Sequence, residues 1–313
     1  MILKIILLMV GIGLVLWGAD RFTDGSSGLA RKWNVSELVI GLTIVAAGTS
    51  LPEFMVSLIS TLRGSSDMSV GNIIGSNIFN GLAILGASAL MMPIAVQRTL
   101  LFRDLPFMFL VSLMLFLLVF FDGEITRIDA ALFIAFFVLY LYYTYHVAMT
   151  NKKAEERSAE KEEKSSSYTI LMLQIVVGMA ALVIGARLMV NEGADMARMW
   201  GVSESMIGLT ILAGGTSLPE LATSMMAAYK GREGLAVGNV IGSNVFNIAC
   251  ILGTCAFIHP MLVKQIAVTD WITLVGSSIL VWILSFTRNK IDKYEGAILL
   301  LCFFTYIFNL ICK

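Results

Sequence analysis

The hexapeptide GTSLPE at Gly48–Glu53 occurs again, unchanged, at Gly215–Glu220. A second block, GNIIGSNIFN at Gly71–Asn80, returns as GNVIGSNVFN at Gly238–Asn247. In both cases the two copies are 167 residues apart (215 − 48 and 238 − 71). Two blocks that recur in one register indicate an internal repeat, and a repeat constrains the fold more than any single segment does.

The composition is that of a membrane protein. The chain has 313 residues, of which 58% are hydrophobic and 14% are charged, and its formal net charge is +0. Soluble domains carry about 25% charged residues, so most of this chain is expected to face lipid or other apolar helices. Because basic residues do not outnumber acidic ones, the chain lacks the positive charge that is typical of nucleic-acid-binding proteins. We therefore expect the lipid bilayer, and not a nucleic acid, as the surroundings of this protein.

Apolar stretches long enough to span a bilayer, about 20 residues each, recur along the whole chain. They predict an all-α polytopic membrane protein with ten transmembrane helices. The expected spans are residues 2–32, 36–63, 68–92, 101–121, 127–149, 168–199, 203–229, 235–258, 267–287 and 293–312.

The only strongly hydrophilic stretch, residues 151–167, separates the two sets of five spans. The predicted domains are therefore a first repeat over 1–150, a linker over 151–167 and a second repeat over 168–313. An odd number of spans in each repeat makes the second copy enter the membrane from the opposite side. The repeats are expected to be inverted, as they are in many secondary transporters.

Basic residues concentrate in the linker and in the loops on its side of the membrane. Because Lys and Arg are enriched in cytoplasmic loops, we expect the linker to be cytoplasmic and both termini to be outside. The expected location is the plasma (inner) membrane.

Two acidic residues fall in the middle of apolar spans, Glu53 in the second and Glu220 in the seventh. A carboxylate at such depth costs several kcal/mol unless it is paired, and it is a candidate functional residue by default. No basic residue stands at a matching depth in the repeated blocks. A bound cation is therefore the expected counter-charge.

The residues around these acids supply further oxygen atoms. Pro52 and Pro219 lack a backbone N–H and are expected to kink or break their helices, which frees carbonyl groups. In the following span, Ser76 and Asn80 lie on one helical face because they are four residues apart. The other candidate oxygen ligands near the breaks and in the second copy are Thr49, Ser50, Thr216, Ser217, Ser243 and Asn247.

Inversion is expected to bring the two half-sites together at the middle of the membrane. The resulting cage would contain carboxylates, amides, hydroxyls and carbonyls, and neither thiol nor imidazole. Such an all-oxygen set suits hard cations such as calcium and sodium, and does not suit zinc or copper.

These motifs closely resemble the two alpha-repeats of the sodium/calcium exchangers, within the calcium/cation antiporter superfamily, in their prokaryotic form. The resemblance covers essentially the whole chain. It implies that Glu53 and Glu220 are central ligands shared by calcium and sodium, and that Asn80 and Asn247 flank them. It further implies sodium-binding hydroxyls and carbonyls on Thr49, Ser50, Ser76, Thr216, Ser217, Ser243, Ala46 and Ala213.

The implied function is exchange of calcium for sodium by alternating access, with no enzyme activity, no cofactor and no obligatory protein partner. One departure concerns Asn247, because some relatives carry Asp there. With only two acids in the cage, the stoichiometry and a role for potassium stay open. The rival readings are a calcium/proton antiporter on the same fold and a passive cation channel. An intramembrane enzyme lacks support, because no nucleophile–base set stands in the spans.

Overall fold

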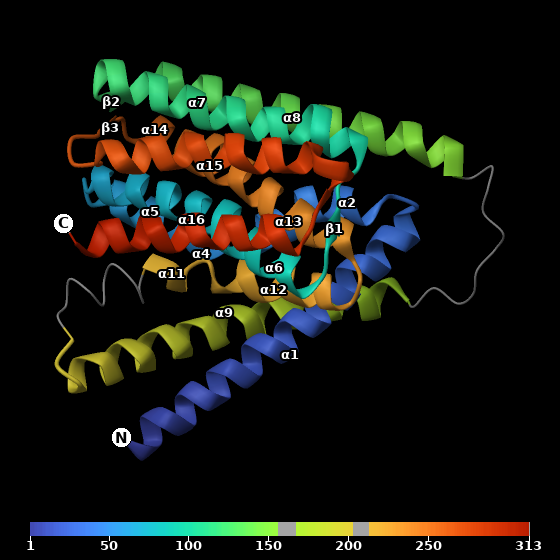
Figure 1. Ribbon diagram of the computed structural model, residues 1–313, viewed down its shortest axis with the longest axis horizontal. Helices are drawn as coiled ribbons and strands as arrows, with labels where there is room; N and C mark the ends of the chain where they lie inside the picture. The colour runs from blue at the N-terminus through green and yellow to red at the C-terminus, as the bar shows by residue number, and fades with distance from the viewer. Residues whose placement is uncertain (156–166, 203–212, 313) are drawn as a thin grey trace.

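A computed structural model describes residues 1–155, 167–202 and 213–312 of this helical bundle (Figure 1). The elements of the first repeat are α1 (Ile2–Trp33), α2 (Glu37–Ile40), η1 (Gly41–Val45), α3 (Ala46–Thr49), α4 (Leu51–Leu62), α5 (Ser66–Ile78), η2 (Phe79–Ile84), α6 (Leu85–Met91), β1 (Ile94–Ala95), η3 (Leu100–Asp104), α7 (Leu105–Asp122), β2 (Glu124–Ile125) and α8 (Arg127–Glu155). Those of the second repeat are α9 (Tyr168–Met199), α11 (Ala213–Gly215), α12 (Leu218–Tyr229), α13 (Glu233–Val245), η5 (Phe246–Leu252), α14 (Gly253–Ile258), β3 (Met261–Leu262), α15 (Val268–Phe286), η6 (Thr287–Asn289), β4 (Lys290–Ile291) and α16 (Lys293–Ile311).

The all-α polytopic architecture is confirmed. Within the described residues, eight helical runs are long and apolar enough to cross a membrane, and a bent pair of helices, Glu37–Thr49 and Leu51–Leu62, makes a ninth. The predicted span 203–229 is described only from α11 onward, so the structure is consistent with ten spans. Helix α8 continues to Glu155, beyond the predicted end of the fifth span.

The two ends of the chain lie on one side of the bundle, and the end of α8 and the start of α9 lie on the other (Figure 1). Short antiparallel strand pairs join connecting segments of the first repeat to connecting segments of the second. Strand β1 pairs with β4, and β2 pairs with β3. We call the side where α8 ends and α9 begins the linker face. The side where α1 begins and α16 ends is the termini face.

The two helical runs that carry the GNxxGSN blocks lie in the centre of the bundle. Ser66–Met91 and Glu233–Ile258 have 78% and 72% of their most apolar stretches buried, whereas the other membrane-spanning candidates have 17% to 39%. Lipid-facing helices can be apolar all round, but these two need a sequence that packs against protein on every side. Small and polar residues in both blocks meet that need.

The long helices α1 and α9 form a pair at the edge of the bundle (Figure 1). They touch through glycines: a Cβ on Gly18 would lie 2.8 Å from the carbonyl oxygen of Gly178, and one on Gly11 would lie 3.0 Å from that of Gly185. Gly178 and Gly185 are the repeat equivalents of Gly11 and Gly18. The contact is therefore symmetric about the axis that relates the repeats, and it brings the two backbones as close as small residues allow.

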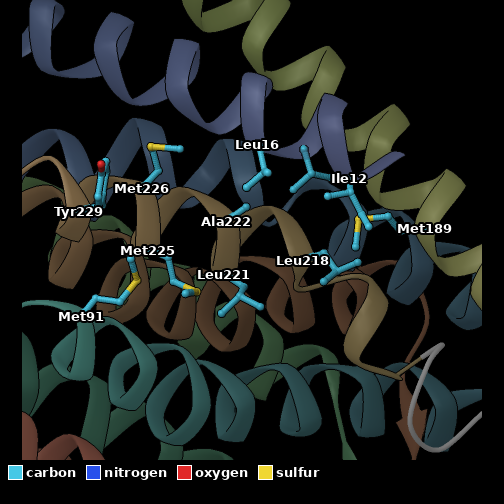
Figure 2. Close-up of a pocket in the computed structure, with 11 residues that line it drawn as sticks. Ile12, Leu16, Met91, Met189, Leu218, Leu221, Ala222, Met225, Met226 and Tyr229 are labelled. Atoms are coloured by element: carbon cyan, nitrogen blue, oxygen red, sulfur yellow. The ribbon is translucent and has the colours of Figure 1, made fainter. Parts of the chain in front are cut away.

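An apolar crevice of about 270 Å³ lies between part of this pair and helix α12. Figure 2 shows its side chains, which come from α1, α9, α12 and α6 and include Met91, Met189, Met225 and Met226. Methionine is flexible and polarizable and can adapt to more than one packing arrangement. The crevice therefore permits small displacements of the pair against α12.

Ion pairs connect the pair to the core at the linker face. Lys230, at the end of α12, contacts Asp20 and Asp24 of α1 at 2.6 Å and 2.8 Å, and Arg232 contacts Asp24 at 2.8 Å. At the termini face, Lys4 of α1 instead pairs with acids of its partner α9, including Glu192 at 3.7 Å. These charges thus hold α1 to the core at one face only.

We predict that Gly18→Val lowers the stability of the folded protein by about 1–3 kcal/mol, because the added side chain would collide with the α9 backbone. Gly13→Val is the matched control, since Gly13 is exposed on the same helix and an added Cβ there meets no described atom within 4 Å. The measurement is the thermal unfolding midpoint in detergent. Equal midpoints for the two variants would contradict the close α1–α9 contact.

Candidate ion-binding site

The second span breaks at Ser50, next to the predicted position. Helix α3 ends at Thr49, α4 begins at Leu51 with Pro52 in its first turn, and the two segments are bent by 47°. Proline explains the break, because it cannot donate the helical hydrogen bond and its ring clashes with the preceding turn. The predicted kink at Pro52 is confirmed.

The second repeat breaks in the same way. Helix α11 ends at Gly215 and α12 begins at Leu218, with Pro219 in its first turn. Glu53 and Glu220 consequently lie in the first turns of α4 and α12. The unpaired N–H groups and the positive dipole end of a helix N-terminus favour a carboxylate there. Each break therefore offsets part of the cost of burying its own acid.

The two GTSLPE blocks interlock across the repeats. Ser50 Oγ donates to Glu220 Oε1 at 3.0 Å, and Ser217 Oγ is placed to donate to Glu53 Oε1 at 2.7 Å. Both glutamates are 0% exposed. The structure thus brings the two half-sites into one buried centre, and each repeat supplies a hydroxyl to the carboxylate of the other.

The next helices bring their polar face to the same centre. Ser76 Oγ lies 3.4 Å from Glu53 Oε1 and 3.0 Å from Ser217 Oγ. Asn80 lies in the π-helix η2, and Asn247 lies in the π-helix η5. The wider π turns recur at functional sites, and here they occur at the equivalent place in both repeats.

The two flanking amides differ in their surroundings. Asn247 Nδ2 donates to Ser76 Oγ at 3.1 Å and to Asn77 Oδ1 at 3.0 Å. Asn80 is equally buried, yet neither atom of its amide has a hydrogen-bond partner among the described residues. The centre is therefore asymmetric, although the sequences of its two halves match.

The predicted carbonyl ligands can be placed only in part. Ala46 O accepts the helical hydrogen bond from Ser50 N at 3.1 Å, so one of its lone pairs is used within the helix. The carbonyl that loses its helical donor to Pro52 is that of Gly48, four residues earlier. The second lone pair of Ala46 O remains, and the hydroxyls of Thr49 and Ser243 lie 3.4 Å and 3.5 Å away. Ala213 is the first residue of α11, and its side chain lies outside the described residues.

Several buried oxygens at this centre have no donor. Within the described part of the chain, these are Glu53 Oε2, Glu220 Oε2, Asn80 Oδ1, Asn247 Oδ1 and Thr216 Oγ1. Neither glutamate forms an ion pair with a described Lys, Arg or His side chain. Buried polar atoms without partners are costly, and a bound cation would satisfy both the oxygen acceptors and the carboxylate charge.

The chemistry of this set is that of a hard cation site. No group of three or more His, Cys, Asp or Glu that could hold a metal occurs in the described ranges. Carboxylate, amide and hydroxyl oxygens are the ligands of calcium and of other hard cations. The geometry therefore fits a transported alkali or alkaline-earth ion.

A hollow of about 590 Å³ reaches this centre from the side of α4 and α9. Its lining includes Pro52 beside Glu53, Thr216 of the second break, and the polar side chains of Asn72, Arg187 and Asn191. Because α4 runs from the break towards the termini face, the hollow lies between the centre and that face.

Sequence reasoning missed an amide pair at the centre of the bundle. Asn77 Nδ2 donates to Asn244 O at 3.0 Å, and Asn244 Nδ2 donates to Asn77 O at 3.3 Å. The pair joins α5 to α13 at the axis between the repeats. The signal was available, because both residues stand in the repeated GSN triplets, but only the distance across the bundle assigns the role.

The family follows from a comparison with known proteins. The family model for sodium/calcium exchanger proteins matches residues 3–146 and 170–312. The chain belongs to the sodium/calcium exchanger family. It is accordingly a multi-pass membrane cation antiporter and not an enzyme.

Similar proteins support this assignment over the full length. The putative antiporter CaxA of Alkalimonas amylolytica is 39% identical, with 98% of each chain covered. The sodium/calcium exchanger MaX1 of Methanosarcina acetivorans is 30% identical, over 96% of this chain and 97% of MaX1. A solved structure of the sodium-calcium exchanger NCX_Mj superimposes with a TM-score of 0.85 at 30% identity, covering 99% of both chains.

We predict that Ser50→Ala and Ser217→Ala each reduce kcat/KM for cation transport by about tenfold or more. Each change removes a hydroxyl beside a buried carboxylate, and hydrogen bonds to charged groups are worth about 1.5–3 kcal/mol. The measurement is tracer calcium flux in proteoliposomes. Ser112→Ala is the control, because Ser112 is buried on α7 and, among the described residues, its hydroxyl bonds only to Met108 O of its own helix. Equal rates for all three variants would argue against the interlocked centre.

Proposed function

We propose that this protein exchanges calcium for sodium at the buried centre between the repeats. The observation that carries the proposal is the pair of cross-repeat contacts from Ser50 to Glu220 and from Ser217 to Glu53, surrounded by buried oxygens without donors. A bound cation would neutralise the two carboxylates and satisfy these oxygens. The names of the exchangers MaX1 and NCX_Mj support sodium and calcium as those cations.

The proposed ligands divide by chemistry. Glu53 and Glu220 supply the charge that both ions share, and the amide oxygens of Asn80 and Asn247 complete the centre. The proposed sodium sites draw on the hydroxyls and carbonyls of Thr49, Ser50, Ser76, Thr216, Ser217, Ser243, Ala46 and Ala213.

Competition between calcium and sodium for the same two carboxylates would couple the fluxes of the two ions. Empty, the buried acids would repel each other, and either one calcium or several sodium ions would relieve that repulsion. If only occupied centres can reorient across the apolar bundle, calcium moves one way only when sodium moves the other. No further cofactor is part of the proposal, and potassium is not expected to be required, because Asn247 leaves the centre with only two acids.

The proposed reorientation is a sliding of the α1–α9 pair over the core. The apolar crevice beside α12 and the glycine contacts within the pair are compatible with such movement, and the ion pairs of Lys230 and Arg232 with α1 would have to break or exchange partners. The proposed orientation places the linker face in the cytoplasm and the termini face outside, in the plasma membrane, because basic residues concentrate at the linker face.

The decisive experiment imposes sodium, potassium and pH gradients separately on proteoliposomes and measures uptake of calcium-45. We expect uptake with an outward sodium gradient alone, and none with a potassium or pH gradient alone. Uptake driven by the pH gradient without sodium would replace sodium by protons as the coupling ion. Uptake independent of every opposing gradient would indicate a channel.

Under the sodium gradient, Glu53→Gln and Glu220→Gln are each expected to abolish uptake, because one remaining carboxylate cannot neutralise calcium. Asp122→Asn, which changes an exposed carboxylate at the end of α7, is expected to transport normally. Folding is checked by gel filtration of each variant in detergent. If both glutamine variants exchanged calcium at the normal rate, the assignment of Glu53 and Glu220 to the site would be wrong.

A further inference from the structure

Asn77 lies beside a proposed ligand without belonging to the proposed ligand set. It stands on α5, it is 1% exposed, and both ends of its side-chain amide have partners. Its Nδ2 donates to the backbone oxygen of Asn244 on α13 at 3.0 Å. Its Oδ1 accepts a hydrogen bond from Asn247 Nδ2 at 3.0 Å. Asn77 thus connects the backbone of α13 to the amide of a proposed ligand.

The acceptor character of a backbone carbonyl fixes the orientation of both amides. A carbonyl oxygen can only accept, so the end of the Asn77 amide that faces Asn244 O must be its nitrogen. The other end, which faces Asn247, is therefore its oxygen. Because that oxygen can also only accept, the Asn247 atom 3.0 Å away must be the nitrogen.

This orientation leaves the oxygen of Asn247 available to a cation. The oxygen is the end of an amide that binds hard cations, and the NH2 group is a donor only. Asn247 Oδ1 is buried and has no hydrogen-bond partner among the described residues. A reversed amide would set two acceptor oxygens against each other at Asn77 and would offer its NH2 group to the ion.

The amide of Asn247 lies at the edge of the buried centre. Its Nδ2 also donates to Ser76 Oγ at 3.1 Å, and Ser76 Oγ lies 3.4 Å from Glu53 Oε1. Asn247 itself is 0% exposed, so water does not compete for its amide from outside. The direction in which its oxygen points therefore matters for any ion bound between the glutamates.

The equivalent residues of the other half are not connected in this way. The 167-residue register relates Asn77 to Asn244 (244 − 77) and Asn80 to Asn247 (247 − 80). Asn244 Nδ2 donates to Asn77 O at 3.3 Å, which mirrors the bond from Asn77 to α13. Asn244 Oδ1 and both amide atoms of Asn80, however, have no hydrogen-bond partner in the ranges that the structure describes. Joining α5 to α13 therefore does not itself require a bond to the flanking amide.

We propose that Asn77 is a positioning residue that keeps the oxygen of Asn247 available to the transported cation. Asn77 acts through its hydrogen bond to the Asn247 nitrogen, and its own amide is held in place by the backbone of Asn244. This inference rests on the proposed binding of calcium at the centre and adds the residue that decides how one ligand is presented.

A carboxylate at position 247 would remove the need for positioning. Both of its oxygens can bind a cation, so in Asn247→Asp either one serves as the ligand. That carboxylate would also face the Asn77 oxygen, which cannot donate to it. If Asn77 only held α5 against α13, its removal would weaken calcium binding equally whether residue 247 is Asn or Asp.

The test measures equilibrium binding of calcium-45 to the purified full chain in detergent, without sodium. Asn77→Ala is expected to weaken binding by about two- to tenfold, the equilibrium shift that one hydrogen bond supplies. In the Asn247→Asp background, the same change is expected to leave binding unchanged or to strengthen it. Equal losses in the two backgrounds, or no loss in the native one, would overturn the proposal.

Asn244→Ala is the matched control, because it removes the mirrored bond between α5 and α13 and leaves the backbone acceptor of Asn77 in place. It is expected to leave calcium binding nearly unchanged. A loss as large as that of Asn77→Ala would assign the effect to helix packing and would contradict a positioning role.

A second measurement tests the bond between Asn77 and Asn247 without any ion. Thermal unfolding midpoints are compared for Asn77→Ala, Asn247→Ala and the double variant in detergent free of calcium and sodium. The double variant is expected to lose less than the sum of the two single shifts, because either change alone already breaks the shared bond. Additive shifts would overturn the proposal. If Asn77→Ala does not fold, Asn77→Ser replaces it in both measurements.

The outcome is separable from that of the proposed function. Calcium binding that is lost in Glu53→Gln but falls equally in the two backgrounds removes only the positioning role. Calcium binding that Glu53→Gln leaves unchanged removes the proposed site and the positioning role with it. Unequal losses in binding, together with uptake driven by protons in place of sodium, would keep the positioning role and replace the coupling ion.

Discussion

Burial of two carboxylates at one point in a membrane-spanning bundle is the constraint on which this architecture depends. Glu53 and Glu220 are inaccessible to solvent, and neither pairs with a described basic side chain. Removing such charges from water costs several kcal/mol per ion. Helix N-termini and hydroxyls from the opposite repeat offset part of that cost, and in the proposed function a bound cation offsets the remainder.

Inverted repetition supplies this centre from a single sequence block. Because each half enters the membrane from the opposite side, the two breaks meet, and Ser50 and Ser217 exchange partners. The copies share a sequence without sharing a conformation. Asn247 donates two hydrogen bonds, whereas neither amide atom of Asn80 has a partner among the described residues.

Much of this was predictable from the sequence. The apolar spans follow from composition, the break at Pro52 follows from proline chemistry, and the meeting of the glutamates follows from the 167-residue register. The different surroundings of Asn80 and Asn247 could not be predicted, because the two copies carry the same residue at this place. The role of the Asn77–Asn244 pair depends on a distance across the bundle that the sequence does not contain. Helix α8 continues past the predicted span because intrahelical hydrogen bonds satisfy its backbone in water as well as in lipid. The Ala46 carbonyl keeps its helical partner because that partner is Ser50 N, whereas Pro52 removes only the donor to Gly48 O.

The central claim is that one transported cation sits between the two buried carboxylates. The most direct measurement is an experimental structure of the protein in calcium without sodium, with the ion located by anomalous scattering. The account predicts one calcium ion with carboxylate oxygens of both Glu53 and Glu220 at about 2.3–2.6 Å, the usual calcium–oxygen distance. Calcium bound elsewhere, or bound by only one of the two glutamates, would contradict it.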